Sequence, residues 1–239
     1  GPGPSANAWD VEFASFEGSG ANFFTVTDKA SQPTGLAFKT DGTKLFVVGL
    51  TSDAVHEYSL STAWDVSTAS FQQSFSVSSQ EAIPSGVFFR NDGGSEDGKK
   101  MYIIGYSGDD INEYDLTTAW DISTASYSQN FSVSTEEATP RGLFFKNDGT
   151  KMYVVGSTGD DVNEYDLSTA WDVSTASYNQ NFSVSAQESN PTGIFFRNDG
   201  SSNDGKQMYI SGDSGNDVNE YSLSTAWDIS TASYVQRFS

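Results

Sequence analysis

Residues 140–156 read PRGLFFKNDGTKMYVVG, and this stretch decides the fold. Residues 142–146 and 151–155 are short apolar runs that contain aromatic and β-branched side chains. Asn147-Asp148-Gly149 lies between them, and an Asp-Gly pair readily adopts the positive φ angles of a tight hairpin turn. The stretch therefore predicts two antiparallel strands joined by a short turn.

The pattern recurs along the chain. Four prolines, each followed two positions later by glycine, stand at intervals of 51, 56 and 51 residues: Pro33, Pro84, Pro140 and Pro191. A Trp-Asp pair also recurs, at Trp9, Trp64, Trp120, Trp171 and Trp227. In the third unit, residues 162–167 and 178–184 add a third and a fourth predicted strand. No segment has sustained helical periodicity, so the chain is predicted to be all-β.

Units of this length, with four short strands, Asp-Gly turns and many aromatic residues, are typical of β-propeller blades. A blade is packed on both faces, which agrees with near-continuous apolar runs such as residues 151–155. A β-solenoid is the main alternative, but its strands stack in parallel, whereas short Asp-Gly hairpins require antiparallel pairing. We therefore expect a β-propeller of four blades, each with four antiparallel strands.

The repeats also set the predicted domain limits. Gly1-Pro2-Gly3 has the composition of a cleaved-tag scar, so residues 1–7 are interpreted as scar and leader and residues 8–239 as one domain. The four repeats span residues 33–83, 84–139, 140–190 and 191–239. Residues 8–32 resemble the end of a further unit and are predicted to provide an N-terminal strand that clasps a closed four-bladed ring. Because the C-terminus carries a fourth strand of its own, a different blade number reached through strand swapping or oligomerisation is the alternative.

The third repeat resembles the blades of a known group of propellers. Its residues Pro-x-Gly-Leu-x-Phe-x-x-Asp-Gly-x-Lys-Met-Tyr-Val-Val-Gly are similar to the opening hairpin of YVTN, NHL and lactonase-like blades. The longer unit is similar to repeats in uncharacterised proteins of marine bacteria and their phages. The resemblance implies a propeller fold and an extracellular, cell-surface or virion location. It implies no single activity, because propellers include enzymes, lectins and scaffolds.

The composition excludes several classes of function. The 32 acidic and 12 basic residues leave a net charge of −20, which repels phosphate backbones and anionic lipids, so we expect neither a nucleic-acid nor a membrane partner. The absence of cysteine excludes disulfides, thiolate metal sites and a cysteine nucleophile. No apolar run approaches the roughly 18 residues of a membrane-spanning helix.

The charged residues are distributed unevenly between the two predicted faces of the propeller. Nine of the 12 basic residues fall in the first hairpins, whereas the turns between second and third strands and the blade-to-blade linkers are almost wholly acidic. Clustered carboxylates beside glycine-rich turns suit Ca²⁺. The predicted metal residues are Asp109, Asp110, Asp160, Asp161 and Asp217, with the third-strand residues Glu113, Glu164 and Glu220. The alternatives are a solvated acidic surface and, for the glutamates, pairing with a neighbouring blade's Lys or Arg or with backbone amides.

The recurring tryptophans are the candidate ligand-binding residues. Exposed indole rings next to carboxylates would suit sugar rings, and their repetition would give up to four equivalent sites: Trp64, Trp120, Trp171 and Trp227. If the indoles are buried instead, they fasten the loop between third and fourth strands to its blade, and the following Asp caps the next turn. The sequence leaves both roles open.

Catalysis finds little support in the sequence, and no catalytic residue is predicted. The single histidine, His56, occupies the position of Asn112, Asn163 and Asn219 and is interpreted as structural. There is no Gly-x-Ser-x-Gly elbow and no histidine cluster for zinc. Because the resembled lactonases hold a metal with carboxylates and Asn in the central channel, a metal-dependent lactonase-like hydrolase stays an alternative.

These observations predict a non-enzymatic binding or structural module of a surface, secreted or virion protein. Nearly identical blades would give multivalent contacts with a polysaccharide or a protein ligand. The alternative is an architectural unit that forms homo-oligomers through the spare edge strand.

Overall fold

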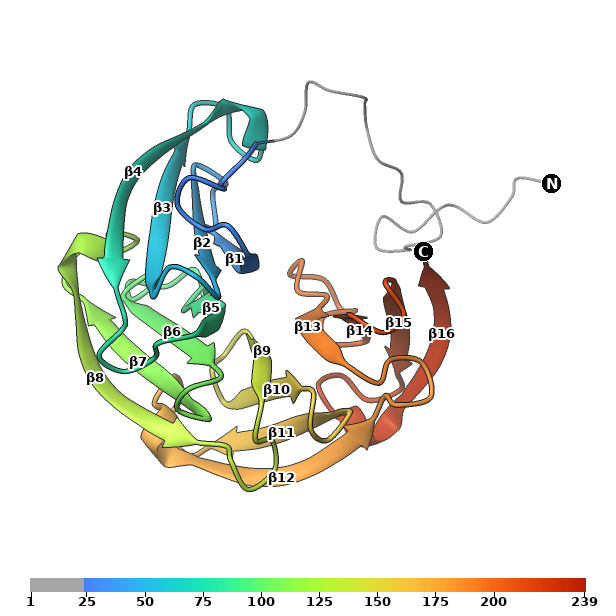
Figure 1. Cartoon of the computed structure of the whole chain (residues 1–239). Coiled ribbons are helices and arrows are strands. Elements are labelled where there is room, and N and C mark those ends of the chain that lie inside the picture. Colours follow the sequence, from blue (N-terminus) through green and yellow to red (C-terminus); the bar gives the residue numbers. More distant parts are fainter. Residues whose placement is uncertain (1–23) are drawn as a thin grey trace.

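The computed structural model describes residues 24–239, which form four sheets of four antiparallel strands. In each sheet the strands follow chain order from the inner to the outer edge, so each sheet is one blade of a propeller (Figure 1). The predicted all-β class and the four blades of four antiparallel strands are confirmed. Helical structure in the described residues is limited to four short 3-10 turns.

The strand bounds repeat closely from blade to blade. The first blade contains β1 (Pro33–Phe38), β2 (Lys44–Gly49), β3 (Ala54–Leu60) and β4 (Ala69–Ser76). The second contains β5 (Pro84–Phe89), β6 (Lys100–Gly105), β7 (Asp110–Leu116) and β8 (Ala125–Ser132). The third contains β9 (Pro140–Phe145), β10 (Lys151–Gly156), β11 (Asp161–Leu167) and β12 (Ala176–Ser183). The fourth contains β13 (Pro191–Phe196), β14 (Gln207–Gly212), β15 (Val218–Leu223) and β16 (Ala232–Phe238). The 3-10 turns precede the outer strands at Val66–Thr68, Ile122–Thr124, Val173–Thr175 and Ile229–Thr231.

The first hairpin of each blade forms as its turn residues predict. Between β9 and β10, Gly149 has a φ of +72°, which glycine adopts without steric cost. The hairpin aligns Met152 with Phe145 and Tyr153 with Phe144, so aromatic side chains gather on both sides of the sheet. Neighbouring blades bury these side chains against each other, and the hydrophobic core therefore lies between the blades.

Glycines let the inner strands of neighbouring blades approach closely. A Cβ atom added to Gly86 would lie 3.0 Å from the carbonyl oxygen of Arg141, and one added to Gly35 would lie 2.8 Å from Gly86 Cα. Both distances are too short for a larger residue without displacement of the backbone. The Pro-x-Gly motif thus brings the start of each inner strand to the axis of the propeller.

The four blades form an open arc, with the first and fourth blades on either side of the opening (Figure 1). A closed ring of four was expected, but packing against the neighbouring blades sets the angle between blades, and four such angles leave the ring open. Leu36 on the first blade is accordingly 65% exposed, whereas Val87, at the same position of β5, is 6% exposed.

The predicted clasp, residues 8–32, lies largely outside the described residues. Its described part forms no strand before Pro33. The outer strand of the fourth blade is β16, which comes from the C-terminal end of the chain and pairs with β15. Phe24 and Val26 instead pack against the core of the first blade, beside Tyr58.

Candidate functional site

A pocket of about 390 Å³, which we call the axial pocket, lies where the inner strands of all four blades begin. The second residue of each inner strand lines it: Thr34, Ser85, Arg141 and Thr192. The turns that follow β2, β6 and β14 contribute Leu50, Tyr106 and Asp213. Its volume lies within the range of small-molecule sites, about 300–1,000 Å³.

Arg141 is the central polar group of this pocket. Its Nη1 atom lies 2.8 Å from Asp213 Oδ2, which joins the third blade to the fourth. Its guanidinium carbon lies 5.0 Å from the centre of the Tyr106 ring, in a cation–π contact with the second blade. These two contacts hold the guanidinium in place, while its Nε atom is buried without a hydrogen-bond partner.

Two further groups define the chemistry of the pocket. The Ser85 hydroxyl donates to the carbonyl oxygen of Arg141 over 2.9 Å, so it fastens the second blade to the third. Burial raises the pKa of Tyr106, with Arg141 opposing the shift, and the phenol therefore stays protonated at neutral pH. The pocket thus presents a paired arginine and aspartate, an aromatic ring and hydroxyl groups.

Differences between the repeats could have revealed this pocket from the sequence. The residue after the second strand's glycine is Leu50, Tyr106, Ser157 or Asp213, and the residue after the repeat's proline is Thr34, Ser85, Arg141 or Thr192. In nearly identical repeats, these two positions change in charge and aromatic character, and seven of these eight residues line the pocket. The sequence feature that marks the pocket is therefore divergence between the repeats, whereas the candidate residues predicted from the sequence are those that recur in every repeat.

The pocket lies on the face that carries the acidic turns and linkers. Among the linker glutamates, Glu136 is half-buried, and three are buried: Glu81, Glu137 and Glu188. Glu81 Oε1 accepts hydrogen bonds from the backbone amides of Ile83 at 2.7 Å and Ser107 at 3.0 Å. Glu188 accepts equivalent bonds, and although burial alone would raise its pKa, the amides of Gly215, Asn190 and Ser214 lower it. These glutamates fasten their linkers to the adjacent turn, so their carboxylates are held by backbone amides inside the structure.

The aspartates predicted as metal ligands divide into two groups. Asp109 and Asp160 have φ angles of +50° and +52°, a left-handed turn conformation that Asp and Asn tolerate well. Asp110 and Asp161 are buried, and Asn112 and Asn163 donate to them over 2.6 and 2.7 Å. Asp217 accepts the same bond from Asn219 at 2.6 Å. Burial raises the pKa of Asp110 and Asp161, while the neighbouring Asn side chains oppose the rise.

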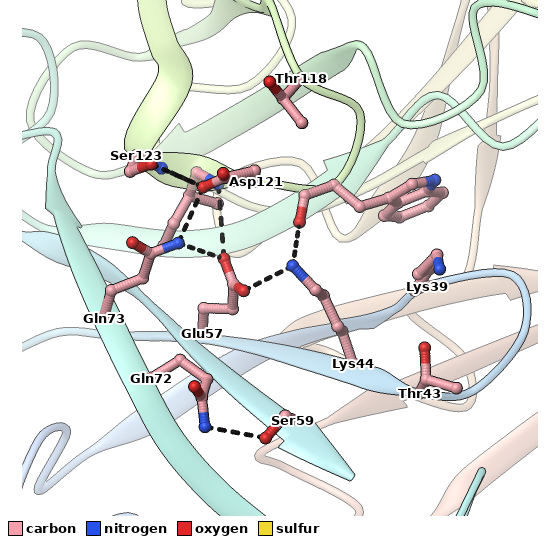
Figure 2. A network of polar contacts seen from close by, with 12 residues as sticks. Lys39, Thr43, Lys44, Glu57, Ser59, Gln72, Gln73, Thr118, Asp121 and Ser123 are labelled. Atoms are coloured by element: carbon pink, nitrogen blue, oxygen red, sulfur yellow. Dashed lines mark hydrogen bonds and ion pairs between the residues drawn. The ribbon is translucent and has the colours of Figure 1, made fainter.

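The third-strand glutamates connect each blade to the next. Figure 2 shows Glu57 bonded to Lys44 of its own blade at 2.7 Å and to Gln73 at 2.9 Å. Gln73 also donates to Asp121 of the second blade over 2.9 Å. We call this set, Glu57 with Lys44, Gln73 and Asp121, an interblade network. Of the two expected partners, a neighbouring blade's Lys or Arg is wrong here, because Lys44 comes from the same blade, in which β2 and β3 are paired. The expected backbone amide is present, since Ile122 N of the second blade donates to Glu57 Oε2 over 3.4 Å.

The network recurs at the next two interfaces. Glu113 pairs with Lys100 and accepts from Val173 N at 3.0 Å, and Glu164 pairs with Lys151 at 2.5 Å. Within residues 24–239, no three His, Cys, Asp or Glu side chains are grouped so that they could hold a metal ion. The structure therefore does not bring the predicted metal residues together, and calcium binding stays a prediction.

Three of the four candidate tryptophans are buried between blades. Trp120, Trp171 and Trp227 are 4%, 2% and 8% exposed, whereas Trp64 is 58% exposed. Trp120 stacks on Phe89 of its own blade and on Phe46 of the first blade, with ring centres 5.2 and 6.2 Å apart. This burial favours the packing role for these three, and only Trp64 presents much of its surface to solvent.

The aspartate after each tryptophan caps the following 3-10 turn. Asp121 accepts from Ser123 N at 3.1 Å, and the same cap recurs at Asp65, Asp172 and Asp228. The tryptophans themselves have positive φ angles, between 60° and 68°, so the loop turns sharply. Gly98 lies directly under the indole of Trp120, where a Cβ atom would come within 2.2 Å of the ring.

His56 belongs to a polar pair found only in the first blade. Its Nδ1 atom lies 2.8 Å from Ser74 Oγ. At this place in the second and third blades, an aspartate accepts hydrogen bonds from two asparagines. Burial lowers the pKa of His56, with Lys29 adding to the effect. His56 does not line the axial pocket.

No protein-family model matches the chain, and no curated protein matches it. Solved structures share its fold. A candidate 6-phosphogluconolactonase from Bacteroides uniformis is 14% identical, with a TM-score of 0.52, over 86% of this chain and 56% of that one. A protein of unknown function from Desulfotomaculum acetoxidans is 15% identical, with a TM-score of 0.55, over 86% and 56%. The WD40 repeats of RRP9 are 13% identical, with a TM-score of 0.52, over 85% and 50%.

These likenesses concern the fold. The chain has the β-propeller fold that lactonase-like and WD40 proteins share, and it spans about half the length of each of these structures. Among the described residues, no helix has the length and apolar character needed to cross a membrane.

Proposed function

We propose that the protein is a non-enzymatic binding module whose axial pocket takes a neutral sugar ring. The observation that carries this proposal is the Arg141–Asp213 pair, fixed beside Tyr106 in a pocket whose lining differs from blade to blade. A fixed arginine and carboxylate offer donors and acceptors to vicinal hydroxyl groups, and an aromatic ring suits the apolar face of a sugar.

The charge of the protein supports a neutral ligand. Arg141 is already neutralised by Asp213, and the net charge of −20 repels anions from this face. A phosphorylated lactone, the compound class in the name of the Bacteroides uniformis structure, is therefore a poor fit. Presentation on a secreted, cell-surface or virion protein would agree with sugar binding and is part of the proposal.

A glycan array tests the proposal. The full chain is expected to bind a subset of neutral glycans, and Arg141→Ala to abolish that binding. Lys99→Ala is the matched control, because it removes one positive charge from the first hairpin of the second blade, outside the pocket. Equal loss in both variants, or binding unaffected by Arg141→Ala, would place the ligand elsewhere.

A panel of lactones tests the hydrolase alternative. No hydrolysis above the uncatalysed rate is expected for the full chain, with or without added divalent metal. Turnover that disappears on chelation would overturn the non-enzymatic proposal and favour a metal-dependent lactonase.

A further inference from the structure

The interfaces between blades share one docking arrangement, in which the Trp-Asp loop of a blade enters the flank of the preceding blade. On the second and third blades, a phenylalanine, a tyrosine, a glutamate and a glutamine form the receiving flank: Phe88, Tyr102, Glu113 and Gln129, and Phe144, Tyr153, Glu164 and Gln180. The same four residue types occupy both flanks. The first blade, which receives the Trp120 loop, shares the glutamate and the glutamine but has Phe46 in place of the tyrosine.

Each residue of the flank recognises one part of the loop. Tyr102 donates its hydroxyl to the carbonyl of Trp171 over 2.7 Å, and the ring of Phe88 stacks on the indole at 6.4 Å. Gln129 donates to Asp172 over 2.7 Å. Glu113 accepts from the amide of Val173 at 3.0 Å. The flank therefore binds the indole and the carboxylate of the loop through their side chains, and it binds the Trp carbonyl and the amide of the third residue through the backbone.

The fourth blade has the same flank although no described blade follows it. Phe195, Tyr209, Glu220 and Gln236 stand at the corresponding positions, and the sheet aligns Tyr209 with Glu220 and Glu220 with Gln236. Gln236 donates to Glu220 over 2.8 Å, as Gln129 does to Glu113 at 3.1 Å. The geometry of a receiving flank is thus already formed on this blade.

We propose that the chain's own Trp9-Asp10-Val11 segment occupies this flank of the fourth blade. These residues lie outside the described part of the chain, and their sequence carries the argument. Residues 8–11 read AWDV, identical to residues 63–66 and 170–173, and the second of these segments docks on the second blade. The same tyrosine, glutamine and glutamate contacts then bind the Trp9 carbonyl, the Asp10 carboxylate and the Val11 amide.

The described residues just before β1 support the Trp9-Asp10-Val11 segment as the occupant of this flank. Phe24 meets Tyr58 edge to face at 5.2 Å, as Phe75 at the end of β4 meets Tyr114 of the next blade at 5.7 Å. The carbonyl of Val26 accepts from Lys29 N and Ala30 N, as the carbonyl of Val77 accepts from Gln80 N and Glu81 N. Residues 24–30 therefore hold the place on the first blade that the end of an outer strand holds on each following blade.

The position of residue 24 places Trp9 within reach of the fourth blade. In the second and third blades, the outer strand ends against the following blade and the Trp-Asp loop lies on the preceding blade. By the same arrangement, a Trp-Asp loop that precedes residue 24 belongs on the fourth blade. The 15 residues from Trp9 to Phe24 can extend up to about 50 Å. A tethered segment also has a high effective concentration, which favours it over the Trp64 loop of a second copy.

Chemical cross-linking of the full chain tests the proposal. Because the chain has no cysteine, a thiol-reactive cross-linker can react only with thiols that are introduced. The variant Asp10→Cys with Gln236→Cys is treated with a short bismaleimide and separated by mass. We expect a cross-link within one chain, several-fold above that of the control Asp10→Cys with Ser126→Cys, which places the second thiol on β8 of the second blade. Circular dichroism checks that each variant is folded.

The other outcomes overturn the proposal. A cross-linked dimer would identify a second copy as the occupant, and equal yields in both pairs would show that residue 10 has no preferred position. As a second measurement, Trp9→Ala is expected to lower the melting temperature by several degrees, whereas Glu12→Ala leaves it unchanged. An unchanged melting temperature in Trp9→Ala would contradict docking. Neither measurement depends on what the axial pocket binds.

Discussion

At the scale of single residues, contacts decide the role of each carboxylate. Glu113 is fully buried, and three groups donate to it: Lys100, Gln129 and the amide of Val173. Asp115 pairs with the same lysine at 2.9 Å, but its side chain is 53% exposed. A buried charge without donors is costly, whereas an exposed ion pair contributes little. The two carboxylates therefore differ in their effect on stability although they share a partner.

This difference gives the first prediction on stability. Glu113→Ala is expected to lower the free energy of unfolding by about 3–5 kcal/mol, because it leaves Lys100 partly buried and the amide of Val173 without an acceptor. Asp115→Ala, the matched control, is expected to cost about 1 kcal/mol or less. Urea unfolding followed by fluorescence measures both, and similar losses in the two variants would contradict the network's role.

At the scale of elements, the Trp-Asp loop is the unit that joins blades. The left-handed tryptophan turns the chain, the hairpin glycine makes room for the indole, and the aspartate caps the 3-10 turn. The loop residues are the same in the first and third blades, yet Trp64 is exposed and Trp171 is buried. The difference arises from the neighbour: the second blade covers Trp171, and no described blade covers Trp64.

Replacing these two tryptophans separates packing from ligand binding. Trp171→Ala is expected to cost about 3–5 kcal/mol, because it opens a cavity between the second and third blades. Trp64→Ala is expected to cost about 1 kcal/mol or less, since much of its ring is already in water. Thermal unfolding of both variants provides the comparison. Loss of glycan binding in a folded Trp64→Ala variant would indicate that Trp64 contacts the ligand, and it would contradict binding in the axial pocket.

At the scale of the whole molecule, local features were predictable and those that depend on packing were not. The hairpin at Asp148-Gly149 follows from the turn residues, and the four strands of each blade follow from the apolar runs. The burial of Trp120 was left open, because its sequence context is the same whether or not a neighbour covers it. The open arc was missed because the number of repeats does not determine the angle at which Phe46, Phe89 and Trp120 pack.

The open arc also predicts a gradient of stability along the chain. Every residue of β5 is buried between the first and third blades, whereas β1 at the opening is mostly exposed or half-buried. In a repeat protein, stability is a sum of each unit's own stability and its contacts with neighbours, so a unit that lacks a neighbour opens more readily.

Hydrogen exchange followed by mass spectrometry should therefore find faster exchange in β1 than in β5 and β9. These strands make a matched comparison, because each is the inner strand of its blade and pairs with one partner. Equal protection in all three would mean that the opening beside the first blade is covered in solution.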